Sequence, residues 1–108
     1  MELQDNGTRV TYEGGCMRED AIGKGRCDLL PPKALLRLAV HFEDGAKKYA
    51  ERNWEHGMPP ERFIDSGLRH LLKHMDGRTD EPHLVAACWN LLCAIEYDER
   101  SKHDETNR

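Results

Sequence analysis

The sequence predicts an all-α fold: a small helical bundle preceded by an irregular N-terminal arm. Three segments, at about 31–52, 60–75 and 82–97, carry apolar residues at helical spacing, and each opens on proline. No segment alternates between apolar and polar residues as a strand with one buried face does. With 108 residues, the chain has room for one domain at most.

The predicted domain covers residues 23–101. Residues 1–22 are polar, rich in glycine and without a sustained period, so they are expected to form the arm. Residues 102–108 form a charged tail that is expected to fray.

Each helix is expected to bury one face. In the first helix this face comprises Leu35, Leu38, Phe42, Ala46 and Tyr49. In the second helix, which Gly77 is placed to end, it comprises Ile64, Leu68, Leu71, Leu72 and Met75. The third helix is apolar around nearly its whole circumference and is expected to be the central, most buried one.

The composition excludes several classes of protein. A third of the residues are charged, with a formal net charge of −4, which argues against nucleic acid as the main partner. No run is long and apolar enough to span a membrane, and residues 1–10 lack a signal-peptide pattern, so a cytoplasmic location is expected (the host cytoplasm, for a phage-encoded protein). The cysteines, without a C-x-x-C pair, are expected to be reduced: Cys16, Cys27, Cys88 and Cys93.

Glu43 is a carboxylate in an apolar arc of the first helix. Its surface neighbours there are Leu36, Ala39, Val40, Ala46, Lys47 and Ala50. Burying an unpaired carboxylate costs on the order of several kcal/mol. Glu43 is therefore expected to be buried and to serve as a metal ligand or catalytic group, the alternative being an ion pair with Lys47 at the edge of the core.

The other two helices carry polar residues of their own. On the third, His83 and Asn90 share a narrow stripe with small residues, which leaves room for a ligand, although both could be satisfied core residues. On the second, His70 and His74 have the spacing of a metal-binding pair, but a solvated, salt-bridged surface is the preferred interpretation, because both point away from the apolar stripe. Arg69 lies closer to the buried side and is an anion-binding candidate.

Four motifs occur in order between residues 23 and 97. They are G-A-x-K-Y at 45–49, N-W at 53–54, R-H-L at 69–71, and D-x-x-H-L at 80–84 followed by W-N at 89–90. In this order and spacing the chain resembles the phage and prophage dATP/dGTP diphosphohydrolase family, to which the MazZ enzymes belong and which is related to the all-α MazG and HisE pyrophosphohydrolases. MazG-type enzymes bind metal through E-x-x-E and E-x-x-D motifs, and neither occurs here as a clean pair on the relevant helices.

The resemblance implies a helical dimer or tetramer that uses Mg²⁺ or Mn²⁺ to hydrolyse a purine (deoxy)nucleoside triphosphate, dGTP or dATP, to monophosphate and pyrophosphate. Glu43, Asp80 and His83 are then the expected metal ligands and catalytic groups. The expected substrate-binding residues are Lys47, Lys48, Asn53, Trp54, Arg69, His70 and Asn90.

Two other functions are compatible with the sequence. A non-catalytic nucleotide-binding or regulatory subunit would explain the sparse carboxylates. A helical interaction module would explain the apolar third helix. Two other helices cannot cover all of its apolar surface, which also predicts a homo-oligomer.

Overall fold

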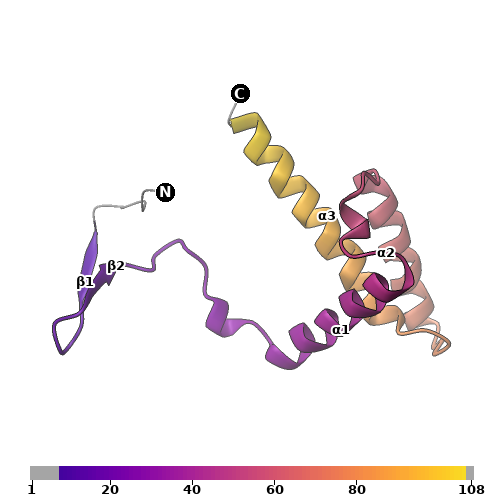
Figure 1. The fold of residues 1–108 in the computed structure, drawn as a ribbon. Helices are drawn as coiled ribbons and strands as arrows, with labels where there is room; N and C mark the ends of the chain where they lie inside the picture. Colours follow the sequence, from indigo (N-terminus) through magenta and orange to yellow (C-terminus); the bar gives the residue numbers. More distant parts are fainter. Residues whose placement is uncertain (1–7, 107–108) are drawn as a thin grey trace. The chain divides into compact units, whose positions relative to one another are not determined.

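The computed structural model describes residues 8–106. The chain divides into two compact units, one ending at Leu30 and the other beginning at Pro31. Within residues 8–106 the second unit contains three helices, α1 (Pro32–Lys48), α2 (Pro60–Met75) and α3 (His83–Thr106), and a 3-10 turn at Asn53–Glu55 (Figure 1). The predicted all-α bundle is confirmed. None of the helices in the described part of the chain is long and apolar enough to cross a bilayer.

The first unit contains a hairpin that the sequence analysis missed. Strands β1 (Arg9–Thr11) and β2 (Met17–Glu19) pair antiparallel, with Val10 opposite Arg18. Gly14 and Gly15 have φ of 95° and 90°, a region that favours glycine, and allow the chain to reverse between the strands. Each strand has three residues, too few for an alternating pattern to stand out. A short 3-10 turn at Cys27–Leu29 follows.

The helix ends follow the local chemistry. Pro32 and Pro60 stand in the first turns of α1 and α2, where a missing N–H costs nothing. Gly77, with φ of 79°, follows α2 and donates its N–H to the His74 carbonyl 3.0 Å away. The predicted end of α1 near Arg52 is wrong: α1 ends at Lys48, and Arg52 itself adopts a left-handed φ of 55°, which a helix cannot contain.

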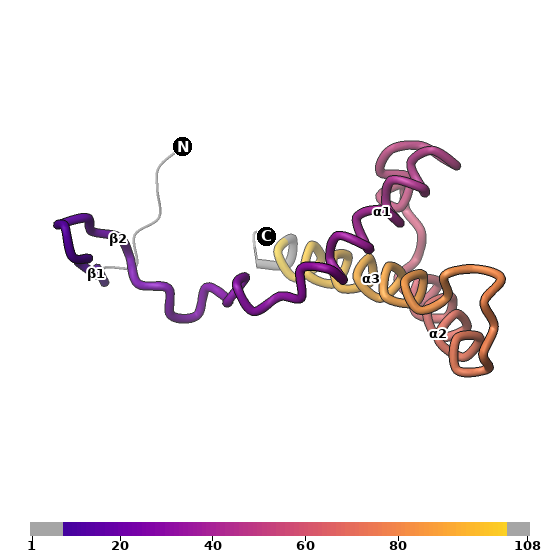
Figure 2. Tube along the Cα trace, turned by 90° about the horizontal axis from the view of Figure 1, so that it is seen from below, coloured from indigo at the N-terminus to yellow at the C-terminus, as the bar shows by residue number. Residues whose placement is uncertain are grey.

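Aromatic rings hold the three helices together. The ring centroid of Trp89 on α3 lies 5.9 Å from that of Phe42 on α1 and 6.0 Å from that of Phe63 on α2. Phe63 is fully buried and also faces Tyr97, farther along α3, at 5.5 Å. Figures 1 and 2 show α2 running beside the first half of α3, while the second half of α3 extends beyond it. The cluster therefore makes α3 the element that both other helices contact.

The predicted buried face of α2 is wrong, because the helix is rotated about its axis relative to the prediction and turns a neighbouring face to α3. The residues turned to α3 are Phe63, Gly67 and His70, whereas Ile64 and Leu68 are about half exposed. Gly67 explains the rotation, because a Cβ there would stand 3.3 Å from the carbonyl oxygen of Ala87 and 3.2 Å from the Cβ of Asn90. The two backbones approach closely through this glycine. In α1, likewise, Leu38 is buried as expected but Leu35 and Tyr49 are exposed.

Helix α3 buries only one of its faces. That face comprises His83, Ala86, Ala87, Asn90 and Cys93. Burial raises the pKa of the Cys93 thiol to about 12, so it stays protonated. Its other side stays uncovered in the single chain, as expected for an apolar helix with only two neighbours, and Leu84, Leu91 and Ile95 there are between 43% and 57% exposed.

The close approach at Gly67 gives a stability test. We expect Gly67→Val to lower the free energy of unfolding by about 1–3 kcal/mol, because the added carbons meet the backbone of α3, which can yield only if the helices separate. The matched control is Gly45→Ala on α1, where a Cβ meets nothing within 4 Å; it should raise the free energy of unfolding by up to about 1 kcal/mol. Urea denaturation at one fixed protein concentration measures both. Equal stability of Gly67→Val and the wild type would refute the account of the α2–α3 contact.

Candidate functional site

A cleft of about 890 Å³ opens between α1, the connection that follows it, α2 and the start of α3. This volume lies within the roughly 300–1,000 Å³ typical of small-molecule sites. On α1 the lining residues His41, Asp44 and Lys48 are spaced by three and four, so one face of the helix points into the cleft. The opposite wall comes from α2.

Cationic side chains from three segments converge on the cleft. Lys48 of α1 and Arg62 of α2 line it, and neither pairs with a carboxylate among the residues the structure describes. Arg69 also lines the cleft but is paired with Asp65 one turn earlier. Arg52 lines the cleft too but is paired with Glu55, which does not, with nitrogen and oxygen 2.5 Å apart. Lys48 and Arg62 are therefore the cations most available to an anionic ligand.

Carboxylates lie in the same cleft as these cations. Asp44, Glu51 and Glu81 line it, and no lysine or arginine in the described residues forms an ion pair with any of them. A polyphosphate alone would be repelled by these groups, whereas a polyphosphate carrying a divalent cation would bring positive charge to them. The charge pattern thus favours an anion bound together with a metal ion.

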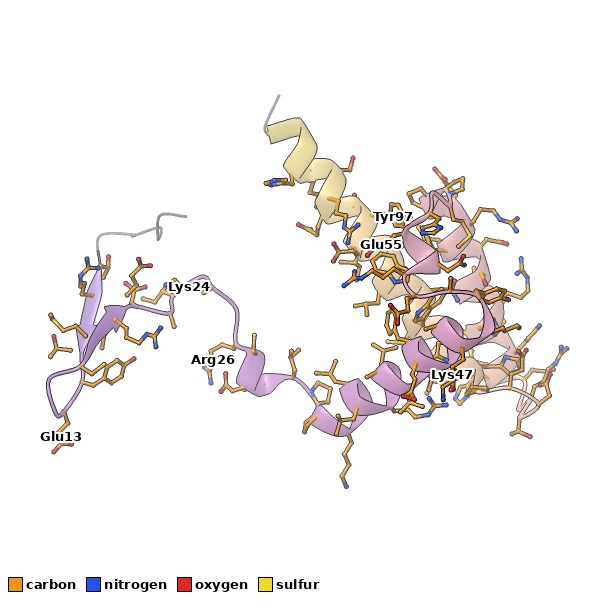
Figure 3. All side chains as sticks on the ribbon, in the orientation of Figure 1. Glu13, Lys24, Arg26, Lys47, Glu55 and Tyr97 are labelled. Carbon is orange, nitrogen blue, oxygen red and sulfur yellow. The ribbon has the colours of Figure 1, made fainter. Side chains whose placement is uncertain are left out.

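Tyr97 of α3 fixes the connection that carries Asn53 and Trp54 to the cleft. Its hydroxyl donates to the Trp54 carbonyl at 2.7 Å and accepts the Gly57 N–H at 3.4 Å. The guanidinium of Arg100 lies 5.3 Å from the centre of the Trp54 ring. Figure 3 shows Tyr97 close to Glu55, at the point where this connection passes α3.

A chain of three polar groups joins α2 to the start of α3 beside the cleft. Nδ1 of His70 lies 2.9 Å from Nδ1 of His83, and Nε2 of His83 lies 2.8 Å from a carboxylate oxygen of Asp80. The His83 side chain has no exposed surface, whereas that of Asp80 is 69% exposed. His70 is half-buried and lines the cleft. The interpretation of His70 as part of a solvated surface is therefore wrong.

The protons of this chain follow from its chemistry. The hydrogen bond from His83 lowers the pKa of Asp80, so the carboxylate is ionised and can only accept. Nε2 of His83 therefore carries a proton, and in the neutral ring Nδ1 is an acceptor for the Nδ1–H of His70. Burial lowers the pKa of His70, which favours its neutral form near pH 7.

The same residues form a possible metal-binding group. One ligand atom each from His70, Glu81 and His83 lies within 4.8 Å of the others. Two imidazoles and a carboxylate form a donor set that first-row transition ions accept. Asp80 is hydrogen-bonded to the other ring nitrogen of His83. Carboxylates often bind metal-ligating histidines in this way and fix their tautomer and ring orientation.

The expected burial of Glu43 is wrong. Its side chain is 62% exposed and lies 3.7 Å from Lys47, in the i,i+4 pair that was the alternative. The inward side of α1 passes through Leu38, Phe42 and Gly45, so the apolar arc around Glu43 faces solvent in the single chain. Neither Glu43 nor Lys47 is among the residues that line the cleft. Their roles as metal ligand and phosphate clamp stay predictions.

Most of the other predicted site residues do come together. The ones that line the cleft are Lys48, Asn53, Trp54, Arg69, His70 and Asn90. His83 and Asp80 adjoin it through His70. Asn90 is buried, and its amide nitrogen donates to the Ala86 carbonyl at 2.8 Å, which leaves the amide oxygen for a ligand.

The sequence analysis missed several polar residues of the cleft. They are His41, Asp44, Glu51, Arg52, Arg62, Asp65 and Glu81. For His41, Asp44 and Lys48, the helical spacing was a usable signal. Glu51 and Arg52 could not be found from spacing, because they lie in an irregular connection.

A family model described as "dATP/dGTP diphosphohydrolase, N-terminal" matches residues 15–107. No curated protein and no solved structure matches the chain.

Proposed function

Because the chain belongs to the dATP/dGTP diphosphohydrolase, N-terminal family, we propose that it hydrolyses dATP or dGTP to the monophosphate and pyrophosphate. The observation that carries the proposal is the cleft, in which unpaired cations and free carboxylates face a histidine–carboxylate group. Each of these parts answers a need of triphosphate hydrolysis: charge neutralisation, an oriented water and a proton acceptor.

The cleft has groups for each part of a nucleotide. Lys48 and Arg62 contact the phosphates, with Arg69 available if it exchanges Asp65 for a phosphate oxygen. Trp54 offers a ring face on which a purine can stack, and the side-chain amides of Asn53 and Asn90 can hydrogen-bond its edge. These contacts fit a purine nucleotide without selecting adenine over guanine.

In the proposed reaction a water molecule attacks the α-phosphorus. A P–O bond forms, the bond from the α-phosphorus to the bridging oxygen breaks, and pyrophosphate leaves. Asp44 or Glu51 accepts the proton of the water, since both are free of ion pairs within the described residues. His83 is fully buried with both ring nitrogens engaged, which favours its role as a ligand or positioning group over that of a general base.

The proposal includes Mg²⁺ or Mn²⁺, as the resemblance to the family implies. The residues fit a divalent ion, because Asp44 and Glu51 bring carboxylate oxygens into a cleft that also needs to hold phosphates. When bound, the ion neutralises developing charge on the phosphate oxygens.

A non-catalytic nucleotide-binding subunit is the second candidate. The exposure of Glu43, the carboxylate that was expected to bind the metal, favours it. Binding of dATP or dGTP without release of pyrophosphate would select it.

The enzymatic proposal predicts pyrophosphate release from dATP or dGTP in the presence of Mg²⁺ or Mn²⁺. Lys48→Met should lower kcat/KM by about 10–100-fold, since a charge-assisted hydrogen bond contributes about 1.5–3 kcal/mol. The matched control is Lys33→Met on the same helix, at an exposed position outside the cleft, which should leave kcat/KM unchanged. Chromatography of the products distinguishes monophosphate plus pyrophosphate from diphosphate plus phosphate. Release of phosphate instead of pyrophosphate, or no turnover at all, would contradict the proposal.

We also propose that the active form is a homo-oligomer in which second copies cover the α2–α3 pair. Leu84, Cys88, Leu91 and Ile95 follow one another at heptad spacing on the exposed side of α3. A second exposed stripe, comprising Ile64, Leu68, Leu72 and Met75, runs along α2.

The two stripes adjoin, because the side chain of Leu91 lies 3.4 Å from the position of a Cβ at Gly67. A helix pair with a continuous apolar face on one side is half of a four-helix bundle, and the same face on a second copy completes it. Apolar surface of this extent on a monomer usually marks an interface.

The oligomer proposal predicts that Ile95→Glu shifts the protein to lower mass, because a carboxylate in the stripe must be desolvated on association. Ser101→Glu, an exposed position on α3 outside the stripe, adds the same charge and should leave the mass unchanged. Light scattering after size exclusion at micromolar concentration measures both. A monomeric wild type would contradict the proposal.

A further inference from the structure

We propose that His70, Glu81 and His83 hold a resident six-coordinate transition-metal ion, of the Fe²⁺, Co²⁺ and Ni²⁺ class, in preference to Mg²⁺. Its place in catalysis rests on the proposed function, while the binding of the ion does not. The ion is distinct from the Mg²⁺ or Mn²⁺ that accompanies the nucleotide.

The separation of the histidine nitrogens carries the inference. Nδ1 of His70 and Nδ1 of His83 lie 2.9 Å apart, within hydrogen-bond distance. Two adjacent ligands about 2.1 Å from an octahedral ion lie roughly 3.0 Å apart, and on a tetrahedral ion roughly 3.4 Å apart. An octahedral ion could therefore be held with the two nitrogens near their present separation. The proton on Nδ1 of His70 would move to Nε2 of the same ring, and each ring would turn so that its Nδ1 lone pair points to the ion.

The chemistry of the donors selects the class of ion. Mg²⁺ prefers oxygen ligands and keeps much of its water, and two imidazole nitrogens suit it poorly. Two histidines and one carboxylate occupy three positions of an octahedral transition ion and leave the remaining positions open. His70 and Glu81 line the cleft, so the open positions face the space assigned to the nucleotide.

The surroundings of His83 keep its Nδ1 available for a metal. Nε2 of His83 donates to Asp80 at 2.8 Å, which fixes the proton on Nε2 and leaves the lone pair on Nδ1. The ring is fully buried, so it cannot turn to expose Nε2 instead. Asp80 is accordingly a positioning residue rather than the metal ligand that the sequence analysis expected.

His74 supplies the internal contrast. It lies one turn beyond His70 on α2, at the spacing of a helical metal-binding pair, but it is exposed and lies outside the group of convergent ligand atoms. A site that depended only on the i,i+4 spacing would need His74. The proposed site does not.

The test is metal binding to the full chain in the absence of nucleotide. After treatment with chelator and desalting, the protein is titrated with Co²⁺ and separately with Mg²⁺, by calorimetry and, for Co²⁺, by visible absorption. We expect one Co²⁺ per chain, bound at least about tenfold more tightly than Mg²⁺, with weak absorption bands of a six-coordinate ion. Circular dichroism melting checks that each variant is folded.

The variants avoid the fully buried ring. His70→Ala should weaken Co²⁺ binding by at least about 100-fold, and Asp80→Asn by about 10–100-fold through the orientation of His83. His74→Ala should bind Co²⁺ as the wild type does. Equal affinity for Co²⁺ and Mg²⁺, or unchanged Co²⁺ binding in folded His70→Ala, would overturn the inference.

The two proposals fail separately. Co²⁺ binding that needs His70, in a protein that releases no pyrophosphate, supports the metal site and refutes the enzymatic function. Pyrophosphate release with Mg²⁺ that is unaffected in His70→Ala supports the function and refutes the metal site as part of it.

Discussion

The contact of His70 with His83 is the interaction on which the rest of the site depends. It joins α2 to the first residue of α3, and the Asp80 carboxylate completes it. A buried imidazole needs partners for both nitrogens, and this arrangement supplies one on each side. The relative position of α2 and α3, and with it one end of the cleft, follows from satisfying one buried ring.

The helix pair separates two kinds of surface. Towards α1 it presents the charged cleft, and on its other side it presents the apolar stripes around Leu68 and Leu91. The single chain buries few large side chains, with Phe63 and Leu38 the main apolar ones, and a core this small leaves a short chain only marginally stable. Association through the apolar side would stabilise the helices while leaving the cleft open.

The sequence predicted the helices well but their orientation poorly. Proline and glycine mark where α2 begins and ends, and these signals are local. Which face of α2 turns inward depends on Gly67, whose missing side chain matters only because Ala87 lies opposite, and no periodicity contains that information. For the same reason the sequence predicted the wrong burial for Glu43: the apolar arc around it exists, but another face of α1 packs against α3. His83 was identified because a histidine on an apolar helix is conspicuous. Glu81 lies in the connection before α3, where a carboxylate is unremarkable, and gave no such signal.

The central claim is that a nitrogen-ligated ion sits at the edge of a nucleotide cleft. Anomalous diffraction at the cobalt edge tests it most directly, on crystals grown with Co²⁺, Mg²⁺ and a dATP analogue that cannot be cleaved between the α- and β-phosphates. The account predicts an anomalous peak between Nδ1 of His70 and Nδ1 of His83, with Glu81 beside it and the analogue in the adjoining cleft. A peak confined to the phosphates of the analogue, with the two histidines still hydrogen-bonded to each other, would contradict it.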